Sequence, residues 1–296
     1  MRWRFATLDV FTAKRFAGNP LAVVLDPEGL DTAGMQMIAR EFNLSETVFV
    51  MRTQAARRGR VRIFTPKAEI PFAGHPTIGT AVLLGALGSP KHRDVVLEEA
   101  IGDVRCSVEP LDGERGRARF DLPQLPNETR PAADAAALAA ALGIDASEIG
   151  FDNFVPGCWS AGNELTFVPV RSLGAIAKCR IDPEHWDAID RDGPAGVYVF
   201  CRETVEPGRS FHARMFAPGL GVPEDPATGS AAAAFAGLLA TSEEAGDGEH
   251  RFLLEQGYEM GRPSLIELSL SMEAGKLRSA AIGGEAVLVS EGTLEA

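Results

Sequence analysis

The stretch that decides the fold is Arg62-Ile63-Phe64-Thr65-Pro66, followed by Gly74-His75-Pro76-Thr77-Ile78-Gly79-Thr80-Ala81, because it occurs a second time. The second copy reads Arg214-Met215-Phe216-Ala217-Pro218 and then Glu224-Asp225-Pro226-Ala227-Thr228-Gly229-Ser230-Ala231. Arg, Phe and Pro recur after 152 positions (214 − 62), and the later Pro, Gly and Ala recur after 150 (226 − 76), so one two-residue deletion aligns the copies. Solenoid units run only about 20–50 residues. The spacing therefore indicates a duplicated domain.

Both copies share one local pattern. An Arg-x-Phe strand end leads into a Pro-rich loop, which holds a polar residue, His75 or Asp225, before a proline. A glycine with a small hydroxyl residue follows, and then an apolar helix that we expect to begin at Ala81 and at Ala231. The first amides of a helix lack intrahelical partners and its dipole makes that end positive. Since glycine lets a ligand approach the backbone, each copy resembles a carboxylate or phosphate cradle.

Alternatively, both loops are ordinary helix caps formed by Gly with Ser or Thr. A single copy would favour this interpretation. The retained duplication favours a functional pair, with one cradle in each half facing the other across a cleft.

Composition limits the class of protein. With 296 residues, 45% hydrophobic and 24% charged, the chain has room for about two domains and a sizeable core. Its net charge of −12 and its pI of about 5.0 argue against nucleic-acid binding and against docking on an anionic membrane. A small anionic substrate stays compatible, because a helix end can outweigh the global charge locally.

Cysteine spacing and apolar runs narrow the class further. The four cysteines are scattered and form neither a Cys-x-x-Cys pair nor a metal-ligand pattern with histidine, so we expect reduced, buried thiols and no metal site: Cys106, Cys158, Cys179 and Cys201. Asp9 and Lys14 interrupt the apolar start before a signal-peptide core can form, and no run approaches the roughly 18 residues of a membrane span. No Gly-x-Gly-x-x-Gly follows a strand, so no dinucleotide cofactor is predicted. We expect a soluble, cytoplasmic protein.

The segment from 5 to 50 contains two of the candidate site residues. Strands are expected at 5–11 and 21–25, joined by a turn in which Asn19 either makes the turn or lines the cleft. A helix at 31–42 leads to a strand at 44–50, whose alternation places Glu46 on one face with Val48 and Val50. A carboxylate among apolar residues is unusual. Alone it fits a strand edge in water, but beside a cleft it is a candidate acid/base group.

Three prolines between positions 123 and 131 place the linker of a two-domain chain. The predicted fold class is α+β, with two similar halves, each a mostly antiparallel sheet wrapped around a central apolar helix, and the active site in the cleft between them. The first domain is expected at 1–122 and the second at 123–279. The final strand, 280–292, is expected to return to the first domain, since chain ends often lie close together.

Four segments together resemble the phenazine-biosynthesis isomerase (PhzF-like) family. They are Phe16-x-Gly18-Asn19-Pro20, Ser45-Glu46-Thr47-x-Phe49, Gly74-His75-Pro76-Thr77 and Asp225-Pro226-Ala227-Thr228-Gly229-Ser230-Ala231, in family order across nearly the whole chain. The resemblance implies the diaminopimelate-epimerase fold, which agrees with the duplication. It also implies an isomerase that moves a proton without metal or organic cofactor, as in the isomerisation of trans-2,3-dihydro-3-hydroxyanthranilate, and it allows a homodimer.

The resemblance further implies roles for individual residues. Glu46 matches the proposed general acid/base, while His75, Asp225 and Ser230 match polar residues around the substrate. Gly74, Gly79 and Gly229 lie on the two helix-start loops, and we include these glycines and Asn19 among the substrate-binding candidates. Alternative roles are a loop cap for His75 and a helix N-cap for Asp225.

One departure from the wider fold is informative. Its epimerases and racemases use two cysteines, one at each helix-start loop, whereas this chain has His75 and Asp225 there and no cysteine in either loop. A two-thiol racemase is therefore not expected. Two other functions remain compatible with the sequence: a cofactor-independent epimerase or racemase using Glu46 with His75 or Asp225, and a non-catalytic protein that binds a small ligand.

The mechanism that we expect moves a proton between carbons of a small carboxylate-bearing substrate. Backbone amides near Gly229 and Ser230 hold the carboxylate, and Glu46 removes a proton from one carbon and returns it elsewhere on the conjugated system. An ordinary glutamate has a pKa of about 4.3, so Glu46 suits this chemistry only where apolar burial strengthens it as a base. His75 or Asp225 donates to, or orients, the group on which charge develops.

Overall fold

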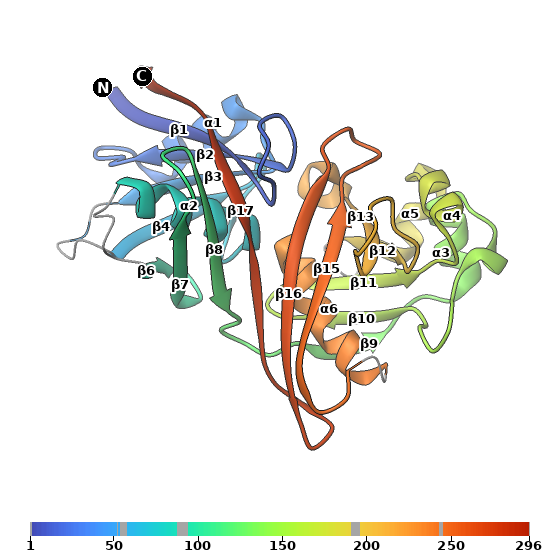
Figure 1. Ribbon diagram of the computed structural model, residues 1–296. Helices are drawn as coiled ribbons and strands as arrows, with labels where there is room; N and C mark the ends of the chain where they lie inside the picture. Colours follow the sequence, from blue (N-terminus) through green and yellow to red (C-terminus); the bar gives the residue numbers. More distant parts are fainter. Residues whose placement is uncertain are drawn as a thin grey trace. The chain divides into compact units, whose positions relative to one another are not determined.

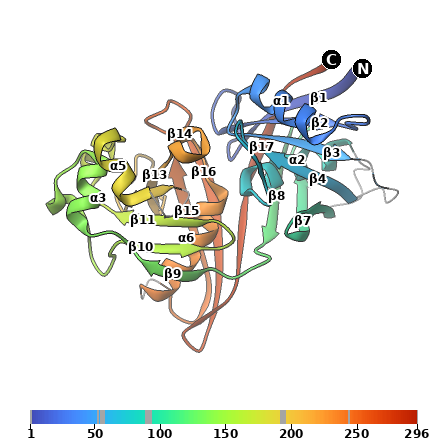
Figure 2. The ribbon, with the colours of Figure 1, turned by 180° about the vertical axis from the view of Figure 1, so that it is seen from behind.

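The computed structural model describes residues 2–51, 53, 58–87, 94–190, 196–242 and 245–295. The chain divides into two compact units. Unit 1 comprises 1–123, 262–264 and 282–296, and unit 2 comprises 124–261 and 265–281. Both are rich in strands and contain a few helices, so the α+β class is confirmed (Figures 1 and 2).

A closed ring of strands forms the frame of unit 1. Its members are β1 (Arg2–Val10), β2 (Asn19–Leu25), β3 (Glu46–Met51), β4 (Arg58–Phe64), β6 (Asp94–Glu99), β7 (Gly102–Pro110), β8 (Arg115–Asp121) and β17 (Lys276–Glu295). Each pairs with the next, and β17 closes the ring by pairing with both β1 and β8. The β2–β3 and β4–β6 pairs are parallel, because a helix lies between their strands in the sequence. Closure leaves this ring without an open edge.

The helix α2 (Gly74–Leu87) lies against the strands of this ring. Its sequence contains no charged residue, so it has no polar stripe for solvent, and it is buried from Gly74 to Leu83. It packs against β1, β2, β3, β6, β7 and β8. A Cβ atom on Gly79 would lie 2.6 Å from Leu21 and 2.7 Å from Val10, so glycine is required here for the close approach of helix and strands.

A shorter helix, α1 (Thr32–Phe42), covers a second apolar cluster of unit 1. Asp31 caps its start by accepting a hydrogen bond from the amide of Gly34, and Asn43 ends it in the left-handed conformation. Met35 and Ala39 are its buried residues. They join a cluster that the strands supply from their other face: Trp3, Val24, Phe49 and Phe64. Unit 1 thus has apolar packing on both faces of its strands.

Unit 2 has its own set of strands and helices. Its strands are β9 (Asn127–Pro131), β10 (Gly157–Ser160), β11 (Glu164–Pro169), β12 (Val197–Cys201), β13 (Phe211–Ala217), β14 (Val222–Asp225), β15 (Gly248–Gln256) and β16 (Ser264–Glu273). The helix α6 (Gly229–Thr241) packs on β9, β10 and β11, and its Phe235 contacts Phe200 and Phe211. The cluster on the other face includes α3 (Ala135–Leu142), α4 (Leu173–Lys178) and α5 (Pro183–Asp190).

Several predicted boundaries were wrong. Both central helices begin earlier than expected, at Gly74 and Gly229 instead of Ala81 and Ala231. In α2 this is possible because Pro76 is tolerated in the first turn, where its missing N–H is not needed. Within the segment taken as linker, Asn127–Pro131 is strand β9, paired with β10. The helix α5 was missed, since its sequence is short and mostly polar.

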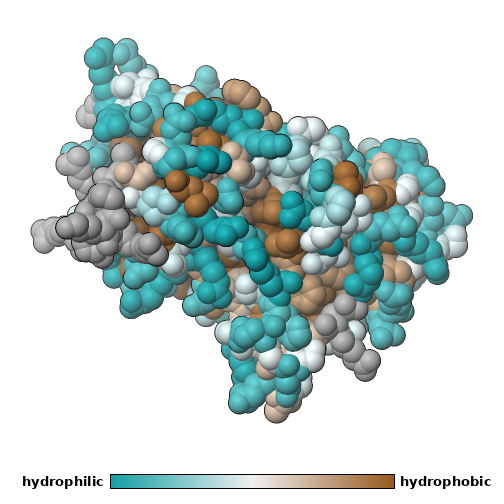
Figure 3. All heavy atoms as spheres, in the orientation of Figure 1, coloured by the Kyte–Doolittle hydropathy of each residue, from teal (hydrophilic) through white to brown (hydrophobic). Residues whose placement is uncertain are grey.

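The surface is mainly polar on the face drawn in Figure 3, where hydrophilic side chains cover much of the visible area. None of the described helices is long and apolar enough to cross a membrane.

Candidate active site

Glu46 is the first residue of β3, between the parallel strand β2 and the antiparallel strand β4. Its alternation with Val48 and Val50 is confirmed, because Val50 lies on the side of β3 that faces α2 while Phe49 packs in the cluster under α1. Only 16% of the Glu46 side chain is exposed. The acid is therefore partly buried on the face that carries the central helix.

The sequence predicted that His75 lies in a loop, but it lies in the first turn of α2. Its side chain is buried, and its Nδ1 atom is 3.3 Å from Oε2 of Glu46. The side-chain amide of Asn19, from β2, lies 3.2 Å from the same Nδ1 atom. Three candidates that are far apart in the sequence thus meet at one ring nitrogen.

Burial lowers the pKa of His75 to about 3, so the imidazole is neutral at physiological pH. A carboxylate at 3.3 Å would favour the imidazolium, but complete burial of the ring opposes its charge more strongly. With Nδ2 of Asn19 donating to Nδ1, the His75 proton lies on Nε2. The Glu46 contact is then a hydrogen bond when Glu46 carries a proton. The geometry fits the acid form of an acid/base pair.

In unit 2, Asp225 ends β14 and is buried. Its Oδ2 atom accepts a hydrogen bond of 2.6 Å from the hydroxyl of Thr228. Gln256 donates to the Asp225 carbonyl (2.7 Å) and to the Thr228 hydroxyl (3.1 Å), and accepts from the Thr228 amide. Asp225 is thus not the N-cap of α6; Thr228 occupies that position, with its side chain turned toward Asp225.

The start of α6 has the properties expected of an anion cradle. Thr228 makes no side-chain hydrogen bond to the first-turn amides, so Gly229 and the half-buried Ser230 begin a helix without a side-chain cap. Gly74 occupies the first position of α2. Gly79 lies one turn further along, where packing on Leu21 already explains the glycine without a ligand.

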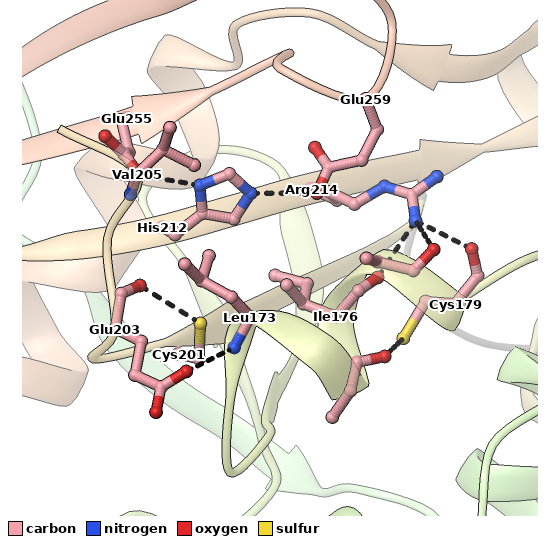
Figure 4. Close-up of polar contacts among 12 residues, drawn as sticks. Leu173, Ile176, Cys179, Cys201, Glu203, Val205, His212, Arg214, Glu255 and Glu259 are labelled. Atoms are coloured by element: carbon pink, nitrogen blue, oxygen red, sulfur yellow. Dashed lines mark hydrogen bonds and ion pairs between the residues drawn. The ribbon is translucent and has the colours of Figure 1, made fainter.

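Arg214 on β13 forms an ion pair with Glu224 on β14 and also binds the end of α4, where Figure 4 shows its contacts with backbone carbonyls. Arg214 binds Glu224 through two hydrogen bonds of 2.8 and 3.0 Å, and its third nitrogen donates to the carbonyls of Ile176 and Cys179 at the end of α4. Because Glu224 directly precedes Asp225, this pair fixes the strand that carries Asp225. Arg62 binds Glu69 in the same bidentate way in unit 1.

Figure 4 also shows a fully buried histidine that the sequence reasoning missed. His212 lies between Glu255 (Nδ1 to Oε1, 2.7 Å) and Glu259 (Nε2 to Oε1, 3.0 Å). Burial alone would lower its pKa, but the hydrogen bonds to the two carboxylates outweigh this effect and raise it to about 9. His212 is therefore a buried imidazolium. His212 lies two residues before Arg214 on the same strand, so the two side chains are on one face. This spacing could have indicated from the sequence that His212 shares the surroundings of Arg214.

The cysteines are buried, as predicted, and poorly suited to acid/base work. Burial raises the pKa of Cys179 and of Cys201 to about 12, and it also raises the pKa of Cys106 and Cys158. In the described part of the chain, no three His, Cys, Asp or Glu side chains are grouped to hold a metal ion.

Comparison with known proteins places the chain in a family. A family model described as "phenazine biosynthesis-like protein" matches residues 8–292. The chain belongs to this family. Among curated relatives, it is 51% identical to an uncharacterized isomerase of Mesorhizobium japonicum, over 97% of this chain and 96% of that protein. It is 36% identical to the trans-2,3-dihydro-3-hydroxyanthranilate isomerase of Pseudomonas fluorescens, over 98% of each chain.

Solved structures agree with this assignment. The Bacillus anthracis phenazine biosynthesis protein of the PhzF family has a TM-score of 0.89 and 27% identity, and each chain is covered completely. A probable proline racemase of Agrobacterium radiobacter shares the fold at a TM-score of 0.65, with 15% identity over 99% of this chain and 93% of the other. The family member described here is an isomerase with an epimerase-type fold.

Proposed function

We propose that this isomerase moves a proton between two carbons of a small, carboxylate-bearing, unsaturated substrate that resembles dihydro-hydroxyanthranilate, with Glu46 as the general acid/base and no cofactor. The observation that carries the proposal is the contact of Glu46 with a buried, neutral His75, at the same ring nitrogen that Asn19 contacts. A relative 36% identical is named for isomerisation of such a compound.

The reaction requires one carboxyl group to act twice. The Glu46 carboxylate takes a proton from carbon and leaves the electron pair delocalised over the conjugated system. The resulting Glu46 acid then returns the proton to a second carbon, so atoms and charge balance without a redox partner. A neutral His75 suits this cycle, since its Nδ1 lone pair can accept a hydrogen bond from the acid form of Glu46 in place of the Asn19 amide, and its Nε2–H is a donor.

Asp225, Gly229 and Ser230 of unit 2 belong to the same proposal. The uncapped start of α6 supplies amide donors for a substrate carboxylate, and Asp225 is held rigidly beside it by Thr228 and Gln256. Family resemblance supports their joint action with Glu46, and also supports Gly74 and Gly79 as parts of the site. It likewise supports two duplicated halves, at 1–122 with 280–292 and at 123–279, and a homodimer.

The test is deuterium incorporation. The protein is incubated in heavy water with dihydro-hydroxyanthranilate and with a panel of small amino and unsaturated acids, and mass shifts are read. We expect incorporation into one class of compound, lost by on the order of 10²–10⁴-fold in Glu46→Gln. Glu41→Gln, an exposed acid on α1, is the matched control and should keep full exchange.

Chirality and bond position in the labelled product separate the competing reactions. A shifted double bond supports the isomerase, whereas inversion at one carbon with the double bonds unchanged would replace it by an epimerase. Absence of exchange in the whole panel, together with unchanged ligand binding by Glu46→Gln, would contradict the proposal and leave a binding protein.

A further inference from the structure

A second buried acid lies behind the proposed site. Glu99, the last residue of β6, is only 5% exposed, and its Oε1 atom is 2.8 Å from the hydroxyl oxygen of Thr77. Thr77 is in the first turn of α2, two residues after His75. The Oε2 atom of Glu99 has no hydrogen-bond partner among the described residues. The Glu46 reaction does not use this group.

Both contacts of the Thr77 hydroxyl can be hydrogen bonds at the same time only if Glu99 carries a proton. The Thr77 hydroxyl oxygen is also 2.8 Å from the carbonyl oxygen of Ala73, which can only accept. A hydroxyl has one hydrogen, so it cannot donate to both partners. If Thr77 donates to Ala73, Glu99 must donate to Thr77 and must therefore be a neutral carboxylic acid. A buried carboxylate with one oxygen unpaired would be costly, which favours the same state.

In unit 2, a glutamine side chain occupies the place that corresponds to Glu99. In the parallel pair β4–β6, Arg60 lies opposite Glu98, and in the parallel pair β13–β15, His212 lies opposite Glu255. Arg60 and His212 are 152 positions apart, the spacing of the repeat. The residues that follow Glu98 and Glu255 are Glu99 and Gln256. These two side chains therefore occupy equivalent places at the ends of equivalent strands.

Their contacts are similar, although the two threonines are not equivalent positions of the repeat: Thr77 lies within the first turn of α2, whereas Thr228 is the N-cap of α6. The Gln256 amide donates to the hydroxyl of Thr228, and Thr228 donates to Oδ2 of Asp225. A permanent donor in unit 2 thus anchors a threonine at a helix start. Glu99 can play the same part toward Thr77 only while it carries a proton.

We propose that Glu99 is a positioning residue: its protonated carboxyl anchors Thr77 and thereby fixes the first turn of α2, which carries His75. The expected effect on catalysis rests on the proposed function. The effect of the Glu99 proton on the first turn of α2 does not depend on it. Loss of the proton would replace the donor by a carboxylate, so Thr77 would turn from Ala73 toward Glu99 and the first turn of α2 would loosen.

The surroundings of Glu99 set the pH at which this happens. Burial raises its pKa to about 8, and the Thr77 hydrogen bond opposes the rise. Cys106 on β7 is also nearby, and burial together with Glu99 keeps that thiol protonated. Glu99 also lines a hollow of about 170 Å³. The other charged residues that line this hollow are Arg60, Arg62, Glu69 and Glu98.

The experiment compares Glu99→Gln, which makes the anchor permanent, with Glu99→Leu, which removes it, and with Glu98→Gln as an exposed neighbouring control. The Glu99 carboxyl carbon and the His75 ring nitrogens are followed by NMR from pH 5 to 10, and exchange into substrate is measured over the same range. In the wild type, both NMR signals and the exchange rate should change near pH 8, with a loss of up to about tenfold per pH unit above it.

The variants decide the outcome. Glu99→Gln should keep exchange within about twofold at pH 7 and lose the alkaline decline, and its His75 signals should stay constant. Glu99→Leu should lose about 10–100-fold in kcat at all pH values. A wild-type Glu99 that titrates near pH 4–5, or Glu99→Gln with the wild-type decline, would overturn the proposal. The NMR result holds even where no substrate turns over, so failure of the proposed function is distinguished from failure of this one.

Discussion

Two buried histidines in the described part of the chain have opposite charge states. His75, in unit 1, is neutral, and its pKa is lowered to about 3 because complete burial of the ring outweighs the nearby Glu46 carboxyl group. His212, in unit 2, is equally inaccessible, yet two carboxylates raise its pKa to about 9. Burial alone therefore does not determine the charge of a histidine. The number and ionisation of its hydrogen-bond partners also matter, and they distinguish the neutral ring of His75 from the cation of His212.

The largest expected effect comes from removing the cation. His212→Leu would leave Glu255 buried without its counter-charge and should reduce the free energy of unfolding by about 3–5 kcal/mol. Chemical denaturation followed by tryptophan fluorescence measures this, since Trp159 and Trp186 lie in unit 2. The double variant His212→Leu/Glu255→Gln should recover part of the loss. A cost below about 1 kcal/mol would mean that His212 is neutral, as His75 is.

The neutral ring should affect rate instead of stability. His75→Gln removes the imidazole beside Glu46 and should lower kcat/KM for proton exchange by about 10²-fold, while the free energy of unfolding changes by less than about 1 kcal/mol. The measurement is exchange of the labelled substrate at pH 7, with chemical denaturation in parallel. Retained activity within a factor of about two would separate His75 from the reaction.

The two histidines should also give stability opposite pH dependences. The folded pKa of His212 lies above the ordinary value of 6.5, so its contribution is complete below about pH 6.5 and is lost as the pH rises through 9. The folded pKa of His75 lies below 6.5, so its contribution is complete above about pH 6.5 and is lost as the pH falls toward 3.

Difference profiles of unfolding free energy against pH check these signs. Subtracting His212→Leu from the wild type should give a slope confined to the alkaline side, and subtracting His75→Gln a slope confined to the acid side. Each slope should be at most about 1.4 kcal/mol per pH unit. Slopes of equal sign would refute the assignment of opposite charges.

The smallest effect is expected at Asn19. Its hydrogen bond to Nδ1 holds the His75 proton on Nε2, so Asn19→Asp, which can only accept from an N–H, should move the proton to Nδ1. Nitrogen NMR of the ring reports this exchange of tautomers. One hydrogen bond is worth about 0.5–1.5 kcal/mol, so the accompanying rate loss should be about 3–10-fold. An unchanged tautomer would show that Glu46 alone orients the ring.

The sequence predicted the parts of the fold that depend on local patterns. The repeat at spacings of 152 and 150 and the alternation around Glu46 are patterns of this kind. Family resemblance assigned Glu46 and His75 to one site, and Asn19 was left open between a turn and a cleft residue; the structure brings the three together. The sequence did not predict that α2 begins at Gly74, because a proline such as Pro76 is typical both of a loop and of a first helical turn.

Contacts between side chains that are far apart in the sequence could not be predicted from local residue patterns. Glu99 alternates with Val95 and Leu97 along β6, which places it on the buried face, but nothing local shows that Thr77 lies opposite it. Likewise, Glu255 and His212 are 43 positions apart and meet only through the parallel pairing of β13 and β15. Such contacts depend on strand register across the sheet, which residue patterns do not contain.

The strand β17 has a consequence for the order in which this chain is made. Its last residues pair with the first strand from Arg2↔Glu295 to Val10↔Ala286 and close the ring of unit 1. A ribosome that adds about 5–20 residues per second needs about 15–60 s to make the whole chain. During that time β1 and β8 wait with unpaired edges, while nearly all of unit 2 has already been synthesised. The half that is made first is thus the half that is completed last.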